Sequence, residues 1–266
     1  MKRLIRLLGF LAVFYVLINM ATFLFQEKLI FLSERLPHDY TYSFNEPFEE
    51  LNLDSEDGAS INVLYFRAEQ PVGIVVYFHG NAGNLSKWGE IAPQFTSRNH
   101  DVIMMDYRGY GKSKGERSEN AFYEDALLLY AKAMTLHPET NITVFGRSLG
   151  TTFATYVAAK HNPQQLVLES PFYSMERLVK KRYPYLPVDV LLKYKFRTNH
   201  YMQSVRCPVT IIHGTEDRVV PIASAKKLFG AIPQKNRSFI TIENGAHNNL
   251  NTFSEYSDAL DTVIDP

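Results

Sequence analysis

Residues 141–155, NITVFGRSLGTTFAT, join a short apolar run to a run of small residues through Gly146-Arg147-Ser148-Leu149-Gly150. An apolar run of this length followed by helix-compatible residues indicates a buried strand that turns sharply into a helix. A serine at such a turn stands at the end of its strand, and glycines two residues to either side permit the strained backbone. The start of a helix also directs N–H groups towards developing negative charge. The pattern therefore predicts a nucleophilic Ser148.

Other parts of the chain repeat this strand-and-helix pattern. Apolar runs rich in Val and Ile, without clean alternation, lie at 73–78, 101–105, 141–145, 165–168, 209–212 and 238–242. Such runs are typical of strands buried on both faces of a parallel sheet. Helices are predicted at 119–136, 149–159, 223–232 and 253–264. Runs 48–53 and 61–67, joined through Asp57-Gly58, predict an antiparallel edge hairpin. We therefore predict an α/β fold with helices on both faces of a mostly parallel central sheet.

The chain contains a second G-x-S-x-G match, Gly111-Lys112-Ser113-Lys114-Gly115. Its serine is separated from the preceding strand by Arg108-Gly109-Tyr110, and a polar loop follows it instead of a helix. It is not a phosphate-binding loop either, because Asp106 occupies the position of the required first glycine. Ser113 is therefore interpreted as a glycine-flanked serine without a catalytic role.

A serine hydroxyl needs a base to accept its proton, and the base needs an acid to orient it. In hydrolases with this strand–turn–helix nucleophile, the chain order is serine, acid, histidine. His247 follows the predicted strand 238–242 and is the only histidine after residue 213, so it is the predicted base. Asp217 follows the strand 209–212 and is the predicted acid, with Glu216 as the alternative.

The tetrahedral intermediate of acyl transfer also needs hydrogen-bond donors for its oxyanion. The predicted strand 73–78 continues into His79-Gly80-Asn81-Ala82-Gly83-Asn84, where glycines allow N–H groups to turn towards the nucleophile. We predict that the backbone N–H groups of Asn81 and Leu149 form the oxyanion hole, although a simple tight turn would have the same sequence. His79 is expected to be a buried structural residue.

Three segments together resemble the α/β-hydrolase superfamily and, within it, the membrane-anchored Bem46-like branch related to the ABHD13 and ABHD17 types. They are 79–84, 106–113 and 146–150, and the similarity extends from about residue 26 to the end. The resemblance implies an α/β-hydrolase fold and serine hydrolysis without a metal or organic cofactor. It also implies that 106–111 is a structural loop beside the site, and that a lid is inserted at about 171–207.

The first 25 residues predict a membrane anchor, which leaves 26–266 as the hydrolase domain. Lys2, Arg3 and Arg6 precede an apolar run at 7–25 that no charge interrupts and that shows no polar face. Nineteen residues span about 28 Å at 1.5 Å per residue, close to the thickness of the hydrocarbon core. A cleaved signal peptide and a buried core helix are the alternatives. The distribution of basic residues around the run favours a catalytic domain on the non-cytoplasmic side, in the periplasm or a lumen.

The predicted lid is basic and aromatic. Between 171 and 200, seven basic side chains face two acidic ones, and six aromatic residues are interleaved with them. Such a surface suits a membrane interface with anionic head groups, so the lid would accept acyl chains there. The alternative is a solvated basic helix whose aromatic residues pack on the body.

Composition narrows the function further. The 28 Lys and Arg residues equal the 28 Asp and Glu residues, which argues against nucleic-acid binding. The single cysteine, Cys207, excludes an intramolecular disulfide and a multi-cysteine metal site. We therefore expect a membrane-tethered serine hydrolase that cleaves carboxylic esters or thioesters through Ser148, His247 and Asp217. The alternatives are an amidase or peptidase with the same residues, or a non-catalytic membrane-anchored scaffold.

Overall fold

The computed structural model describes residues 1–264. One large sheet forms the centre of the body. Its eight strands are β2 (Phe48–Asp54), β3 (Ser60–Phe66), β4 (Gly73–Phe78), β6 (His100–Met105), β7 (Ile142–Arg147), β8 (Gln165–Glu169), β9 (Val209–Gly214) and β10 (Arg237–Ile242). Their spatial order is β10-β9-β8-β7-β4-β6-β3-β2. Only β3 runs against its two neighbours, and the other pairs are parallel. A two-stranded parallel sheet, β1 (Leu32–Ser33) with β5 (Ala82–Gly83), lies apart from it.

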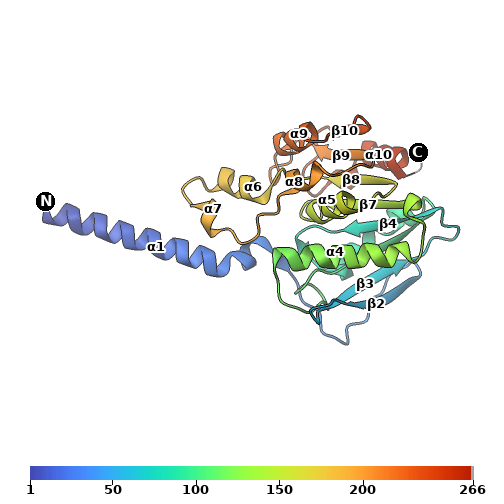
Figure 1. Ribbon diagram of the computed structural model, residues 1–266, viewed down its shortest axis with the longest axis horizontal. Helices are drawn as coiled ribbons and strands as arrows, with labels where there is room; N and C mark the ends of the chain where they lie inside the picture. Colours follow the sequence, from blue (N-terminus) through green and yellow to red (C-terminus); the bar gives the residue numbers. More distant parts are fainter. Residues whose placement is uncertain (265–266) are drawn as a thin grey trace.

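Helices cover both faces of the large sheet (Figure 1). They are α2 (Leu85–Trp88), α3 (Pro93–Thr96), α4 (Glu119–Met134), α5 (Gly150–Lys160), α9 (Ile222–Gly230) and α10 (Ser254–Ile264), with 3₁₀ turns at Gly89–Ile91, Glu139–Asn141 and Leu250–Thr252. Successive strand residues point to opposite faces. On β4, Val76 therefore packs in one apolar cluster with Phe122 of α4, whereas Tyr77 packs in the other with Phe95 of α3. The predicted architecture is confirmed.

The sequence missed the shortest elements. Strands β1 and β5 have two residues each, and α2 and α3 have four each. Segments this short contain only about one period of apolar spacing, so no repeat can reveal a helix or a strand. Tertiary contacts hold them instead: the Leu32 N–H donates to the Asn81 carbonyl at 3.0 Å.

The segment between β8 and β9 forms the predicted insertion and contains α6 (Met175–Arg182), α7 (Val188–Leu191) and α8 (Thr198–Met202). Its aromatic residues divide into two groups. Phe172, Tyr194 and Phe196 are buried against the body, whereas Tyr183 and Tyr185 are exposed. The buried aromatic residues agree with the alternative in which they pack on the body, and the membrane interface stays a prediction.

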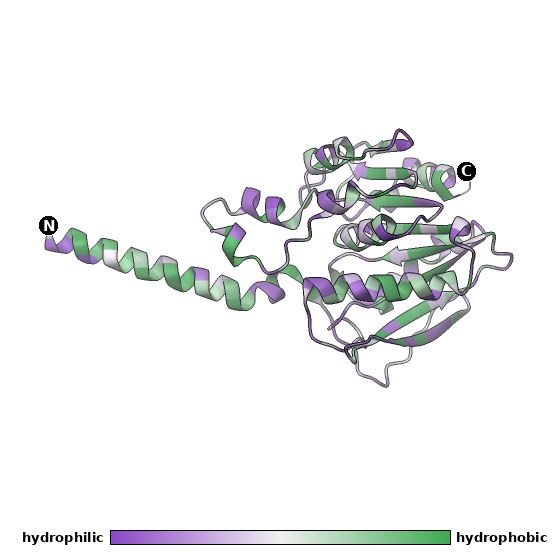
Figure 2. Ribbon diagram, in the orientation of Figure 1, coloured by the Kyte–Doolittle hydropathy of each residue, from purple (hydrophilic) through white to green (hydrophobic). Residues whose placement is uncertain are grey.

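Helix α1 (Lys2–Ile30) projects away from the body (Figure 1). Its 29 residues extend over roughly 44 Å at 1.5 Å per residue, and apolar residues dominate its surface (Figure 2). The helix is long and apolar enough to cross a membrane.

One expectation about α1 was wrong, because the helix does have a narrow polar face. Tyr15, Asn19, Thr22 and Gln26 are spaced four, three and four residues apart, which places them on one side of a helix. This side faces the insertion: the Tyr15 hydroxyl donates to the Tyr185 carbonyl at 2.9 Å, and Gln26 is buried. The average hydropathy of the run does not reveal the stripe, because two or three apolar residues separate each polar residue from the next.

Candidate active site

Ser148 occupies the predicted turn between β7 and α5. Its φ of 50° lies in the left-handed region, and its N–H donates to the Glu169 carbonyl at 2.9 Å, which ties the turn to β8. A side chain at Gly150 would overlap the Phe78 backbone. The glycine therefore allows α5 to approach β4 closely, and the serine hydroxyl emerges at the carboxyl end of the sheet.

His247 connects the other two predicted residues. Its Nε2 lies 2.9 Å from Ser148 Oγ, and its Nδ1 lies 2.7 Å from Asp217 Oδ2. An ionised carboxylate only accepts hydrogen bonds, so Nδ1 carries the ring hydrogen and Nε2 can accept the serine proton. The loops that follow β7, β9 and β10 thus bring together Ser148, Asp217 and His247, which are far apart in the chain.

The carboxylate of Asp217 is held by its own loop. Its Oδ1 accepts the N–H groups of Val219 at 2.9 Å and Val220 at 2.8 Å. Burial by itself would raise the pKa of Asp217. The hydrogen bond from His247, the charge of the His247 ring and the hydrogen bond from the Val220 N–H together hold that pKa below its usual value. The alternative acid, Glu216, is exposed, and the contact to the histidine belongs to Asp217.

The two predicted oxyanion donors lie beside Ser148. Asn81 and Leu149 line the same cavity as the serine, and a Cβ placed on Gly80 would lie 3.8 Å from Ser148 Cβ. His79 Nδ1 donates to the Gly80 carbonyl at 2.6 Å. Because C=O and N–H point in opposite directions across a trans peptide, the Asn81 N–H points away from His79. Within residues 1–264, neither the Asn81 nor the Leu149 N–H has an acceptor, so both are available to a ligand.

His79 and Ser113 lie inside the protein. His79 is fully buried between the rings of Trp88 and Tyr107, and the Tyr107 hydroxyl bonds to its carbonyl at 2.7 Å. Ser113 Oγ accepts the Asn62 N–H at 2.8 Å and donates to the Asp106 carbonyl at 2.6 Å. Neither side chain contacts the Ser148 hydroxyl.

Sequence reasoning missed a brace beside the site, formed by Arg147. The Arg147 guanidinium lies 2.9 Å from Glu169 Oε1, donates to the His247 carbonyl at 3.1 Å and stacks on Trp88. Tyr256 donates to the other Glu169 oxygen at 2.8 Å. The brace thus connects the backbone of His247 to β7, the strand that directly precedes Ser148. A possible signal was the charge on Arg147 and Glu169 at the ends of otherwise apolar strands.

His213 was also missed. It is fully buried at the end of β9, with Nε2 2.9 Å from the Val220 carbonyl and 3.4 Å from Asp217 Oδ2. Burial lowers its pKa, which keeps the ring neutral. Its hydrogen bond to the Val220 carbonyl supports the loop that contains Asp217. A neutral His213 does not form an ion pair with the Asp217 carboxylate, which stays bonded to His247.

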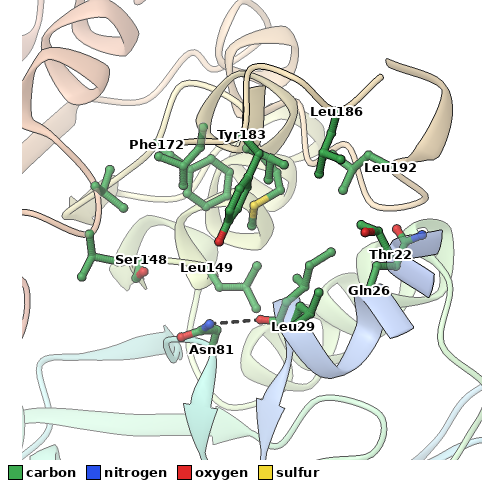
Figure 3. Close-up of a pocket in the computed structure, with 16 residues that line it drawn as sticks. Thr22, Gln26, Leu29, Asn81, Ser148, Leu149, Phe172, Tyr183, Leu186 and Leu192 are labelled. Atoms are coloured by element: carbon green, nitrogen blue, oxygen red, sulfur yellow. Dashed lines mark hydrogen bonds between the residues drawn. The ribbon is translucent and has the colours of Figure 1, made fainter. Parts of the chain in front are cut away.

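A cavity of about 410 Å³ opens beside Ser148 (Figure 3). This volume is within the usual range for small-molecule sites. Besides Ser148, Asn81 and Leu149, its wall is largely apolar and comes from three parts of the chain: α1 (Thr22, Gln26, Leu29 and Ile30), the insertion (Phe172, Met175, Leu178, Val179, Tyr183, Leu186 and Leu192) and the loop after β9 (Val219 and Val220). The insertion therefore supplies part of the cavity wall next to Ser148. Within residues 1–264, no His, Cys, Asp and Glu side chains cluster as three or more potential metal ligands.

The chain is similar in sequence or in fold to known proteins. The family model described as serine aminopeptidase, S33, matches residues 69–197 and 188–252, more than half of the chain. An uncharacterised protein of Mycobacterium tuberculosis is 29% identical over 227 residues, which cover 84% of this chain and 80% of that protein. Protein bem46 of Schizosaccharomyces pombe is 29% identical over 217 residues, covering 77% and 72%.

Two further similarities come from proteins with named activities. The lysophosphatidylserine lipase ABHD12 of Danio rerio is 32% identical over 191 residues, which cover 64% of this chain and 49% of that protein. The solved structure of an esterase from Pyrococcus furiosus superimposes with a TM-score of 0.72 at 16% identity, covering 89% of this chain and 97% of that one. At this identity the structural likeness bears on the fold alone.

Proposed function

Since the chain belongs to the serine aminopeptidase S33 family of hydrolases and is a Bem46-like α/β-hydrolase, we propose that it is a membrane-tethered serine hydrolase that cleaves carboxylic esters or thioesters. The observation that carries the proposal is the continuous hydrogen-bond chain from Ser148 through His247 to Asp217 at the wall of an apolar cavity. A scaffold without activity would not need this alignment.

The proposed reaction has two acyl-transfer steps. Ser148 Oγ attacks the acyl carbon while its proton passes to His247 Nε2, and the carbonyl electrons move to the oxygen as an oxyanion. The N–H groups of Asn81 and Leu149 stabilise that oxyanion, and Asp217 stabilises the charged imidazole. When the carbonyl reforms, the bond to the leaving alcohol or thiol breaks and His247 protonates the leaving group.

Deacylation repeats the same sequence with water. His247 takes a proton from a water molecule whose oxygen attacks the acyl-enzyme carbon, and a second oxyanion occupies the same two N–H groups. The bond to Ser148 Oγ then breaks and the serine regains its proton from His247. The products are a carboxylic acid and the alcohol or thiol, and no cofactor takes part.

The cavity wall favours esters of apolar acids over peptides. An aminopeptidase must bind the charged N-terminus of its substrate, a task suited to an acidic side chain. None of the described residues that line the cavity is acidic, and most are apolar. The name of a lipase among the relatives agrees with this preference.

The proposal places the hydrolase at a membrane, held by α1. Lys2, Arg3 and Arg6 precede the apolar run, and Lys28 and Arg35 follow it. The excess of basic charge before the run favours a cytoplasmic N-terminus and a catalytic domain on the other side. Protease digestion of intact spheroplasts tests this orientation, because the protease reaches only a domain on the non-cytoplasmic side. We expect the catalytic domain to be cut.

Hydrolysis and covalent labelling test the chemistry. The purified full-length chain, in detergent, is assayed on matched p-nitrophenyl esters, thioesters and anilides, and is treated with a fluorophosphonate probe. We expect hydrolysis of esters and thioesters well above that of anilides, and a single probe adduct on Ser148. An adduct on another residue, or none together with no ester hydrolysis, would contradict the proposal.

A further inference from the structure

Helix α1 forms part of the wall of the substrate cavity. Thr22, Gln26, Leu29 and Ile30 line the cavity on one side, and Leu186 and Leu192 of the insertion face them across it (Figure 3). Leu29 lines the cavity while 67% of its surface stays exposed, so it lies at the mouth. A helix that served only as a tether would not need to contribute side chains to the site.

The end of α1 is fixed directly to the catalytic loops. The Asn81 side chain donates to the Ile30 carbonyl at 3.0 Å, and β1, which begins two residues after α1 ends, pairs with β5 beside Asn81. On the other side, the Gln26 amide donates to the Leu191 carbonyl at 3.0 Å and accepts the Lys193 N–H at 2.8 Å. The helix therefore connects the proposed oxyanion loop to the insertion.

The insertion contacts α1 along part of the apolar run. Contacts extend from Gln26 back to Tyr15, whose hydroxyl reaches Tyr185, a distance of roughly 16 Å along the helix axis. Thr22 is both a cavity residue and a member of the apolar run at 7–25. One end of the cavity wall thus lies within the segment proposed to cross the bilayer, and the other end is at Ser148.

The exposed surface of the insertion matches the surface of a bilayer. Tyr183, Tyr185 and Val190 are exposed apolar side chains close to α1, and tyrosines are enriched at membrane interfaces. The last turn of α6 adds Lys180, Lys181 and Arg182, which suit anionic head groups. The insertion and α1 therefore meet at the level where an acyl chain leaves the bilayer.

We propose that the cavity accepts the fatty-acyl chain of an ester or thioester resident in the membrane, and that the chain enters sideways from the bilayer between α1 and the insertion. Thr22 and Leu29 of α1 are then specificity-determining residues for acyl length. Lateral entry keeps the acyl chain out of water until its carbonyl reaches Ser148. This inference rests on the proposed ester or thioester hydrolysis and adds the source of the substrate to it.

Two matched substitutions test the inference in the full-length chain reconstituted in phosphatidylcholine vesicles. Thr22→Trp narrows the cavity, whereas Leu24→Trp introduces the same side chain two residues later, on the exposed, lipid-facing side of α1. Hydrolysis of p-nitrophenyl palmitate and p-nitrophenyl acetate is measured for each variant. We expect Thr22→Trp to lower the palmitate-to-acetate ratio about tenfold or more, and Leu24→Trp to leave it within about twofold.

Each outcome is decisive because the ratio cancels differences in the amount of folded enzyme. Equal ratios in wild type, Thr22→Trp and Leu24→Trp would overturn the inference, as would equal losses in both variants. Leu29→Trp provides a second variant at the mouth if Thr22→Trp does not fold, and the same loss of ratio is expected. Failure of the proposed function looks different, because acetate hydrolysis would then persist in Ser148→Ala.

Discussion

The two G-x-S-x-G segments of this chain share a sequence pattern but hold their serines in opposite ways. Ser113 and Ser148 are 5% and 9% exposed, and Gly111 and Gly150 both stand where a side chain would collide with the protein. However, Ser113 bonds to Asn62 and Asp106 inside the protein, while Ser148 faces His247 and a cavity. The glycines thus indicate tight backbone packing, whereas the position relative to a strand and a helix decides which hydroxyl faces a histidine and a cavity.

The sharpest test of this comparison removes each hydroxyl in turn. We expect Ser148→Ala to lower kcat for a p-nitrophenyl ester 10⁴-fold or more, because the nucleophile is lost. Ser113→Ala should leave kcat within about twofold but cost about 1–3 kcal/mol of stability, because the buried Asn62 N–H loses its acceptor. Ester hydrolysis and thermal unfolding measure the two effects. A large loss of kcat in the folded Ser113 variant would contradict the distinction.

The adjacent acids Asp217 and Glu216 provide the second test. Asp217→Asn should lower kcat about 10⁴-fold, because the amide can no longer stabilise the charged imidazole or hold its Nδ1 hydrogen. Glu216→Gln is the matched control and should retain most of the activity, since Glu216 is exposed. Steady-state hydrolysis distinguishes the two, and comparable losses in both variants would show that the loop as a whole, and not one carboxylate, matters.

The glycines of both segments allow a test of packing. Gly150→Ala and Gly111→Ala should each destabilise the protein by about 3 kcal/mol or more, because the added methyl group overlaps the Phe78 backbone in one case and Asp106 in the other. Gly230→Ala meets no atom within 4 Å and should stay within about 1 kcal/mol of wild type. Denaturant unfolding measures all three, and a tolerated Gly111→Ala would show that only the Ser148 segment is tightly packed.

The Arg147 brace distinguishes the two segments further, because Ser148 follows it directly. Arg147→Ala should lower kcat about tenfold and leave KM within about twofold, since the His247 backbone loses a hydrogen bond while the cavity is unchanged. The rate of fluorophosphonate labelling should fall in parallel. Arg237→Ala, which removes an exposed arginine from another part of the surface, is the control. A change confined to KM would argue against positioning of the base.

The smallest expected effect is the pH dependence that Asp217 adds to stability. Its pKa in the folded protein lies below the usual value of an aspartate, so the unfolded chain binds more protons and ionisation of Asp217 stabilises the fold. That contribution is complete above the unfolded pKa and is lost as the pH falls through the folded pKa. In denaturant unfolding, the stability difference between wild type and Asp217→Asn should therefore shrink as the pH falls below the unfolded pKa of an aspartate, about 4. A constant difference would mean that the carboxylate is not preferentially ionised in the fold.

Much of the sheet was predictable because buried parallel strands leave continuous apolar runs. The predicted strand 73–78 coincides with β4, and 238–242 lies within β10. Runs of two to four residues carry no such pattern, which is why β1, β5 and α2 were missed. The polar stripe on α1 was missed for a related reason: its residues become one surface only when the helix packs on another part of the chain.

The predicted site residues could be chosen because each follows its own strand, and the carboxyl ends of parallel strands lie at one edge of the sheet. Asp217 and Glu216 could not be separated in this way, because adjacent residues share a strand end. The structure separates them through the hydrogen bonds of the loop at Val219 and Val220, which turn one carboxylate inwards. The brace at Arg147 and the support from His213 depend on contacts between strands and were not visible in local sequence.

The α/β architecture, the apolar N-terminal helix and the prediction of Ser148 in preference to Ser113 all follow from local sequence, because each depends on periodicity or on what directly precedes and follows a residue. The folded chain was needed to show which acid faces His247, which N–H groups remain free beside Ser148, and that α1 supplies a wall of the cavity. Those features arise where segments distant in the chain come within hydrogen-bonding or van der Waals distance, and no local pattern of residues encodes such distances.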